Sequence, residues 1–142
     1  LLLYVLSGFA GNVFSFLITP DPSVGSSTSI FGLVAAEGIF LYQNRGLFGE
    51  ETKRAIGNVV SVVAINLFIG FSSGGYIDNW GHIGGLLGGL VFTWFGGPLW
   101  GVDGIYPLLR LVDRRAERDV ALAASMTLLI FGLLALVGIF WS

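Results

Sequence analysis

The chain has 142 residues, of which 54% are hydrophobic and only 11% are charged. Soluble globular domains carry about 25% charged residues, so this composition excludes a domain that is surrounded by water on all sides. The net charge of −2, with seven Lys and Arg residues, excludes a nucleic-acid-binding protein that depends on phosphate neutralisation. With one histidine and no cysteine, we expect no metal site and no other cofactor. The composition is typical of a membrane protein with several helices.

Five segments are apolar and long enough to cross a lipid bilayer. A helix rises 1.5 Å per residue, so it needs about 20 residues to cross a hydrocarbon layer of ~30 Å. The predicted spans are residues 1–18, 25–43, 55–73, 79–97 and 120–141. The sequence thus predicts an all-α fold, a polytopic transmembrane helix bundle with five spans, in which residues 98–119 form a solvated connector.

The basic residues predict the orientation of these spans. All seven lie in two connections, between the second and third spans and between the fourth and fifth: Arg45, Lys53, Arg54, Arg110, Arg114, Arg115 and Arg118. Two crossings separate these connections, so both lie on one side of the bilayer, which the positive-inside rule assigns to the cytoplasm. We therefore expect a multi-pass protein of the cell membrane, with residues 23–29 and 76–82 near the outer face.

Two polar clusters interrupt the apolar segments near that face. The first cluster, residues 20–32, contains two prolines and then four consecutive hydroxyl residues at positions 26–29. Proline is typical of the turn before a helix, and Ser and Thr are typical of the first helical turn. The hydroxyl groups therefore either cap the helix and form hydrogen bonds between helices, or include a nucleophile.

The second cluster, residues 78–89, combines a histidine with a glycine repeat. Gly81, Gly85 and Gly89 recur every four residues, which predicts a helix face of bare backbone that packs closely on a neighbouring helix. His82 lies three residues before Gly85 on the same face, so its ring is expected to point into the protein. Ionisable groups inside membranes are costly and commonly functional. The alternative is a structural histidine that forms hydrogen bonds between helices.

Together, the clusters place a hydroxyl group and an imidazole near the same membrane face, each at the N-terminal end of its helix. A serine hydroxyl is too weakly acidic to attack a carbonyl alone, and a base that takes its proton activates it. These two groups are the minimum set for acyl transfer, provided that they lie within reach of a shared proton.

Both clusters resemble motifs of one known family. Residues 25–32, Gly-Ser-Ser-Thr-Ser-Ile-Phe-Gly, resemble the serine motif of rhomboid intramembrane proteases, and residues 79–85, Asn-Trp-Gly-His-Ile-Gly-Gly, resemble their histidine motif. The resemblance covers residues 1–97, which would be the third to sixth helices of the six-helix rhomboid core, and residues 120–142 would be an additional C-terminal helix. Because Leu1 lies inside an apolar segment without a preceding methionine, we expect the sequence to be a fragment.

The resemblance implies a serine endopeptidase that cleaves single-pass transmembrane proteins in the lipid bilayer by a Ser–His dyad. Ser27 would be the nucleophile and His82 the general base. Phe31, one turn after Ser27, would pack against the imidazole, its alternative role being that of an ordinary core aromatic residue. The Ser27 backbone and Gly25 would support the oxyanion. The family's oxyanion-binding His and Asn would precede Leu1, so this stretch alone is not expected to cleave a substrate.

Two alternatives remain open on the sequence. Thr28 stands where the family usually has glycine, which favours a catalytically inactive rhomboid-like protein that binds transmembrane helices. Glu37 is the one charge inside a span, about 15 Å along the helix from Ser27, and is expected to face neighbouring helices or to be protonated. In a third interpretation, Glu37 and His82 would form the proton path of a proton-coupled transporter.

Overall fold

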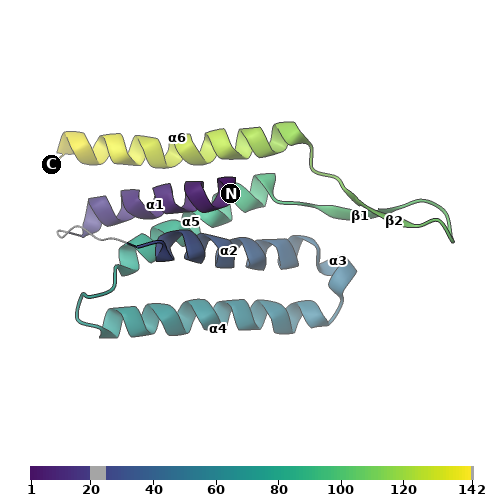
Figure 1. The fold of residues 1–142 in the computed structure, drawn as a ribbon, viewed down its shortest axis with the longest axis horizontal. Coiled ribbons are helices and arrows are strands. Elements are labelled where there is room, and N and C mark those ends of the chain that lie inside the picture. Colours follow the sequence, from purple (N-terminus) through teal and green to yellow (C-terminus); the bar gives the residue numbers. More distant parts are fainter. Residues whose placement is uncertain (20–24, 142) are drawn as a thin grey trace.

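A computed structural model of the chain describes residues 1–19 and 25–141. The elements follow the chain in this order: α1 (Leu2–Ile18), α2 (Ser27–Gln43), α3 (Arg45–Phe48), α4 (Glu51–Ser72), α5 (Asn79–Gly96), β1 (Trp100–Asp103), β2 (Arg110–Asp113) and α6 (Glu117–Trp141). The five long helices correspond to the five predicted segments and form a bundle, from one end of which the two strands project (Figure 1).

Within residues 1–19 and 25–141, the helices that are long and apolar enough to cross a membrane by length and composition are α4 and α6. The apolar helix α1 is shorter. The helical fold is thus confirmed, whereas the crossing of the membrane by all five helices stays a prediction.

Helix α5 packs closely between α1 and α2, because glycines on the face toward each of these helices leave its backbone uncovered by side chains. A Cβ atom at Gly85 would collide with the Thr28 carbonyl oxygen of α2, and one at Gly89 would collide with the backbone of Gly32. This close approach confirms the predicted role of the repeat that includes Gly81, Gly85 and Gly89. A second row of glycines, which the four-residue repeat does not predict, faces α1: a Cβ at Gly84 would meet the backbone of α1.

The outer helices α4 and α6 differ in how firmly they pack. Helix α6 contributes the buried residue Ala123 to an apolar cluster with α1 and α5, and the buried residue Phe131 to a second cluster with α1. Helix α4 buries only Thr52 and Gly70, so the described residues cover little of its surface.

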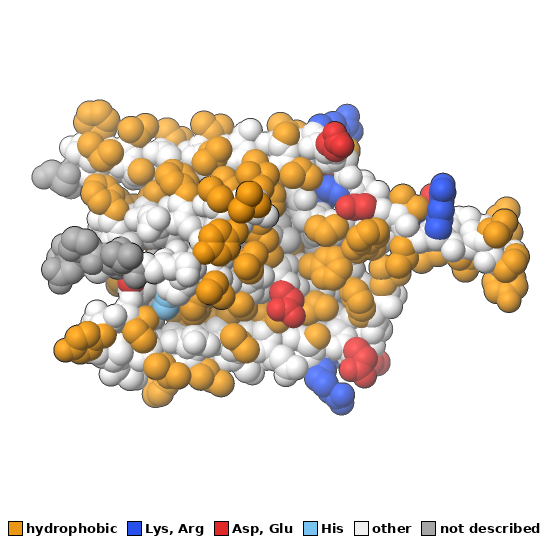
Figure 2. All heavy atoms as spheres, in the orientation of Figure 1, with side chains coloured by type: hydrophobic (Ala, Val, Ile, Leu, Met, Phe, Trp, Pro, Cys, Tyr) orange, Lys and Arg blue, Asp and Glu red, His pale blue; other side chains and the backbone are white. Residues whose placement is uncertain are grey.

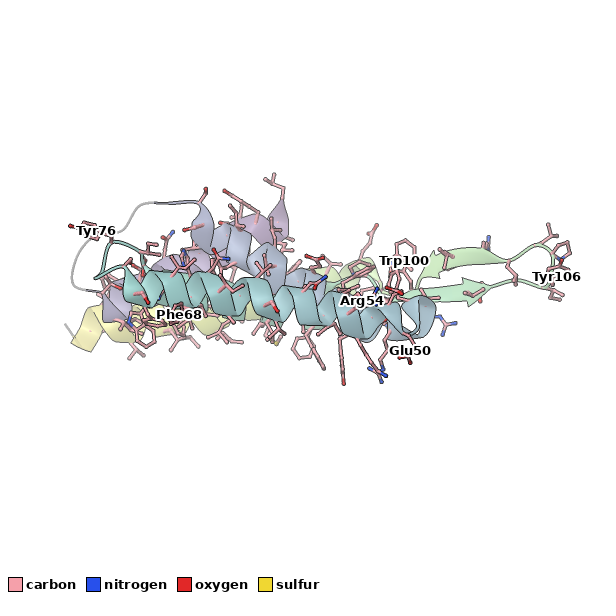
Figure 3. All side chains as sticks on the ribbon, turned by 90° about the horizontal axis from the view of Figure 1, so that it is seen from below. Glu50, Arg54, Phe68, Tyr76, Trp100 and Tyr106 are labelled. Atoms are coloured by element: carbon pink, nitrogen blue, oxygen red, sulfur yellow. The ribbon has the colours of Figure 1, made fainter. Side chains whose placement is uncertain are left out.

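The predicted connector at residues 98–119 contains a β-hairpin. Strands β1 and β2 pair antiparallel, with Trp100 opposite Asp113. The hairpin tip, marked by Tyr106, points away from the helices, whereas Tyr76 lies at the opposite end of the molecule (Figure 3). Four-residue strands are too short to give a clear alternating pattern, which explains why the sequence predicted only a connector.

Two polar side chains, those of Asn44 and Arg115, attach the base of this hairpin to the bundle. The Asn44 side chain, only 3% exposed, accepts a hydrogen bond from the Trp100 backbone N–H (2.7 Å) and donates one to the Pro98 carbonyl (3.1 Å). Arg115 donates to the Gly97 carbonyl (3.0 Å) at the C-terminal end of α5, where the helix dipole favours a cation. Figure 2 shows Lys and Arg side chains at this end of the visible face, as the two basic connections predict.

Candidate active site

Ser27 and His82 lie in the first turns of two helices that start at the same end of the bundle. Ser27 is the first residue of α2, and His82 lies in the first turn of α5. The Asp78 carboxylate caps α5 by accepting a hydrogen bond from the Gly81 N–H (2.8 Å). The close packing of Gly85 on Thr28 then holds the two helix starts together.

The two side chains are in hydrogen-bond contact. The distance from His82 Nε2 to Ser27 Oγ is 2.9 Å, so the condition of a shared proton is met. His82 is buried, with 6% of its surface exposed, whereas Ser27 is exposed. The arrangement therefore offers a hydroxyl group to the surroundings and keeps its hydrogen-bond partner inside the protein.

Phe31 covers one face of the imidazole. Its ring is stacked on the His82 ring, with centroids 4.1 Å apart and an angle of 7° between the planes, which confirms the expected packing. Among the residues that the structure describes, His82 Nδ1 has no hydrogen-bond partner. In this part of the chain, the imidazole is therefore oriented by stacking and close packing rather than by a carboxylate.

The hydroxyl cluster is divided among different environments. Ser26 precedes α2 but makes no capping hydrogen bond through its side chain, so the capping prediction is wrong for this residue. Thr28 and Ser29 are buried in helix interfaces. The prolines and Ser23 of the cluster lie outside the described residues. Gly25 is adjacent to the site, since a Cβ placed on it would lie 3.5 Å from Ser27 Oγ.

Thr28 fits in place of the glycine that the family pattern suggests. Its side chain lies against Gly11 of α1 and Gly81 of α5, both of which lack the Cβ that would collide with it. The β-branched side chain thus occupies space left free by two glycines. With Thr28 packed in this way, the Ser27 hydroxyl remains in contact with His82.

Glu37 is exposed on α2. The expectation that it faces neighbouring helices is therefore wrong for the helices that the structure describes. Glu37 also lies far from His82. His82 contacts Ser27 at the start of α2, whereas Glu37 lies ten residues further along the same helix.

Comparison with known proteins identifies the family. Residues 1–99 match the family model described as the Rhomboid domain. The chain belongs to the rhomboid family. It is 43% identical over 90 residues to "Rhomboid protease GluP" of Bacillus subtilis (strain 168), which covers 63% of this chain and 17% of that protein.

Plant rhomboid-family proteins also match. "RHOMBOID-like protein 9, chloroplastic" of Arabidopsis thaliana is 32% identical over 99 residues, covering 69% of this chain and 22% of that protein. "RHOMBOID-like protein 2" of the same plant is 32% identical over 145 residues, covering 98% of this chain and 45% of that protein. The chain thus spans less than half the length of these rhomboid relatives, and about a fifth of the first two.

Proposed function

We propose that this rhomboid-family protein is an intramembrane serine endopeptidase in which Ser27 is the nucleophile and His82 is the general base. The observation that carries the proposal is the 2.9 Å contact between Ser27 Oγ and His82 Nε2. The similarity to a relative named a protease supports the same reaction class.

The geometry suits a two-step acyl transfer. As Ser27 Oγ attacks the carbonyl carbon of the scissile peptide bond, its proton passes to His82 Nε2, and the imidazolium then protonates the leaving amine. Water repeats the sequence on the acyl-enzyme and releases the acid product. The negative charge on the substrate oxygen develops at the start of α2, where backbone N–H groups such as that of Ser27 lack helical acceptors and the helix dipole favours an anion.

The proposed substrates are single-pass transmembrane proteins. A helix keeps its carbonyl groups in internal hydrogen bonds, so the nucleophile requires a substrate segment that is locally extended. In this proposal, all five long helices cross the bilayer. The basic connections lie in the cytoplasm, and Ser27 and His82 lie near the outer face of the cell membrane.

The proposal is tested by labelling full-length protein in membranes with a serine-reactive fluorophosphonate. Labelling is expected to disappear in Ser27→Ala and to slow by at least about 100-fold in His82→Ala, because the base no longer activates the hydroxyl. Ser26→Ala is the matched control, since it removes the adjacent hydroxyl, and it should keep the labelling of the native protein.

The same experiment separates the alternatives. Native protein that is folded, binds transmembrane helices and shows no labelling dependent on Ser27 would be a catalytically inactive rhomboid-like protein. Proton-coupled transport that survives Ser27→Ala would favour the transporter interpretation. In the part of the chain that the structure describes, no observation favours the transporter, because Glu37 and His82 do not meet.

A further inference from the structure

Asp78 holds the helical turn from which His82 extends. It is the residue before α5, and its side chain accepts a hydrogen bond from the Gly81 N–H (2.8 Å) while its backbone carbonyl accepts one from the His82 N–H (3.1 Å). The N–H groups of a first helical turn lack acceptors inside the helix, so an Asp side chain at this position stabilises the turn. Gly81 makes room for this cap, because a Cβ atom on it would collide with the Asp78 carboxyl group.

The same carboxyl group also contacts α1. The end of α1 and the start of α5 lie at the same end of the bundle (Figure 1). There, Thr19 Oγ1 donates a hydrogen bond to Asp78 Oδ1 over 3.4 Å, which is longer than the usual O–H···O bond and therefore weaker than the cap. The next residue, Asn79, donates to the Leu67 carbonyl of α4 instead. Asp78 and Asn79 thus join one turn to two different helices.

The link to α1 matters more for His82 than the link to α4. Helix α1 lies so close to α5 that a Cβ atom at Gly84 would collide with the α1 backbone. Helix α4, in contrast, buries only Thr52 and Gly70. The first turn of α5 is therefore fixed mainly relative to α1 and to α2, the helix that carries Ser27.

The imidazole depends on this backbone position because few contacts hold the ring itself. Within residues 1–19 and 25–141, Nδ1 of His82 has no hydrogen-bond partner, and one ring face rests on Phe31. The contact from Nε2 to Ser27 Oγ is 2.9 Å long. Displacement of a catalytic group by 1 Å can cost about 100-fold in rate, so a small movement of the first turn of α5 is sufficient to impair the pair.

We propose that Asp78 is a positioning residue for His82: by capping α5 and accepting the hydrogen bond from Thr19, its carboxyl group keeps Nε2 of His82 within hydrogen-bond reach of Ser27 Oγ. This inference rests on the proposed function, because the reaction that Asp78 supports is the one assigned there to Ser27 and His82. Asp78 acts through the backbone of α5. The two hydrogen bonds require an acceptor oxygen, which an Asn side chain also provides.

The test measures the rate of fluorophosphonate labelling of Ser27 over a range of reagent concentrations, on full-length protein in membranes. Asp78→Ala removes the acceptor, so the maximal rate per folded molecule should fall at least about tenfold, while the half-saturating concentration stays the same. Asp78→Asn keeps an acceptor oxygen and should stay within about twofold of the native maximal rate. A native rate in Asp78→Ala, or an equal fall in both variants, would overturn the proposal.

A control separates positioning from general stability. Thr127 is fully buried on α6, and its hydroxyl donates to the Ala123 carbonyl (2.8 Å). Thr127→Val removes this hydrogen bond without touching the start of α5, so the protein loses stability but folded molecules should be labelled at the native maximal rate. If Thr127→Val slows labelling of folded protein as much as Asp78→Ala does, the effect is one of stability and the proposal is wrong.

A second variant tests the link to α1 and does not require Asp78→Ala to fold. Thr19→Val has nearly the same shape as the native residue and leaves the cap of α5 intact, but it removes the donor to Asp78. Loss of one hydrogen bond should lower the maximal rate at least about threefold. An unchanged rate in Thr19→Val would contradict the proposal.

The native protein distinguishes this proposal from the one on which it rests. Absence of labelling that depends on Ser27 in the native protein would contradict the assignment of a serine endopeptidase. Native labelling that Asp78→Ala and Thr19→Val leave unchanged would contradict only the positioning role of Asp78.

Discussion

The ring of Phe31 lies parallel to the imidazole of His82, with a centroid separation of 4.1 Å and an interplanar angle of 7°. Phe31 follows Ser27 by four residues on α2, so one helical turn supplies both the hydroxyl that the imidazole contacts and the surface on which it rests. The serine helix therefore sets the position and the tilt of the histidine ring together. Phe31 therefore helps to orient the His82 ring, although its own side chain is an unreactive hydrocarbon.

We expect Phe31→Leu to slow fluorophosphonate labelling of Ser27 by up to about tenfold. Leucine keeps most of the apolar volume but removes the flat surface, and an aromatic pair contributes about 0.5–1.5 kcal/mol beyond burial. Phe31→Tyr is the control, because it retains the ring and should stay within about twofold of the native rate. An unchanged rate in Phe31→Leu would show that the stacking does not orient the imidazole.

We expect Gly85→Ala to destabilise the protein by about 1–3 kcal/mol, because overpacking forces backbone shifts. The added Cβ would collide with the Thr28 carbonyl oxygen, so α5 must move away from α2 and Ser27 labelling should also slow. Gly132→Ala is the matched control on α6, where a Cβ meets nothing within 4 Å. It should be neutral or stabilise by up to about 1 kcal/mol. Denaturant unfolding in detergent measures both, and equal effects would contradict the packing argument.

The sequence predicts the helices and the approach of the hydroxyl cluster to His82, because both follow from the order of charged, apolar and glycine residues along the chain. Charged residues mark the ends of the apolar segments, so the predicted range 79–97 differs from the observed α5, Asn79–Gly96, by one residue. Ser27 and His82 both lie in the first turns of helices on the same side of the predicted bundle. Parity of the crossings and the glycine face predicted that His82 lies near the hydroxyl residues at positions 26–29, whereas the choice of Ser27 among them came from the resemblance to the rhomboid serine motif.

The remaining features depend on which partner a residue meets in space. The glycine pairs at 84–85 and 88–89 leave two faces of α5 without side chains, but the four-residue repeat predicts only one of them, and the contact of Gly84 with α1 lies on the other. The role of Asn44 requires the hairpin base to lie beside the end of α2, which no local pattern shows. The exposure of Glu37 likewise depends on which helices surround α2.

Asn79 gives a further prediction, because it joins the start of α5 to the end of α4. Its side chain is 4% exposed and donates a hydrogen bond to the Leu67 carbonyl (3.0 Å). Asn79→Ala removes this hydrogen bond and leaves the Leu67 carbonyl without it. The loss of a buried hydrogen bond typically lowers the free energy of unfolding by about 1–3 kcal/mol. We expect amide hydrogen exchange at residues 65–73 to become at least about fivefold faster in this variant.

Asn66→Ala is the control for this effect. Asn66 also donates to a carbonyl of α4, that of Val62 (2.8 Å), but the bond lies within one helix and the side chain is exposed. Exchange in the same peptides should therefore change little. If both variants accelerate exchange equally, Asn79 does not hold α4 against α5.

Thr28→Gly tests whether the departure from the usual family residue impairs the site. Because the Thr28 side chain fills space beside Gly11 and Gly81, its removal should destabilise the folded protein by about 1–3 kcal/mol, through lost packing and the low helix propensity of glycine. The contact between Ser27 and His82 does not use this side chain, so the labelling rate of folded protein should stay within about twofold, since a tenfold change requires about 1.4 kcal/mol. Thr28→Ser removes only the methyl group, so its free energy of unfolding should lie between those of the native protein and of Thr28→Gly. A glycine variant that is labelled at least about tenfold faster would instead show that Thr28 obstructs the nucleophile, as expected for a rhomboid-like protein that has lost its activity.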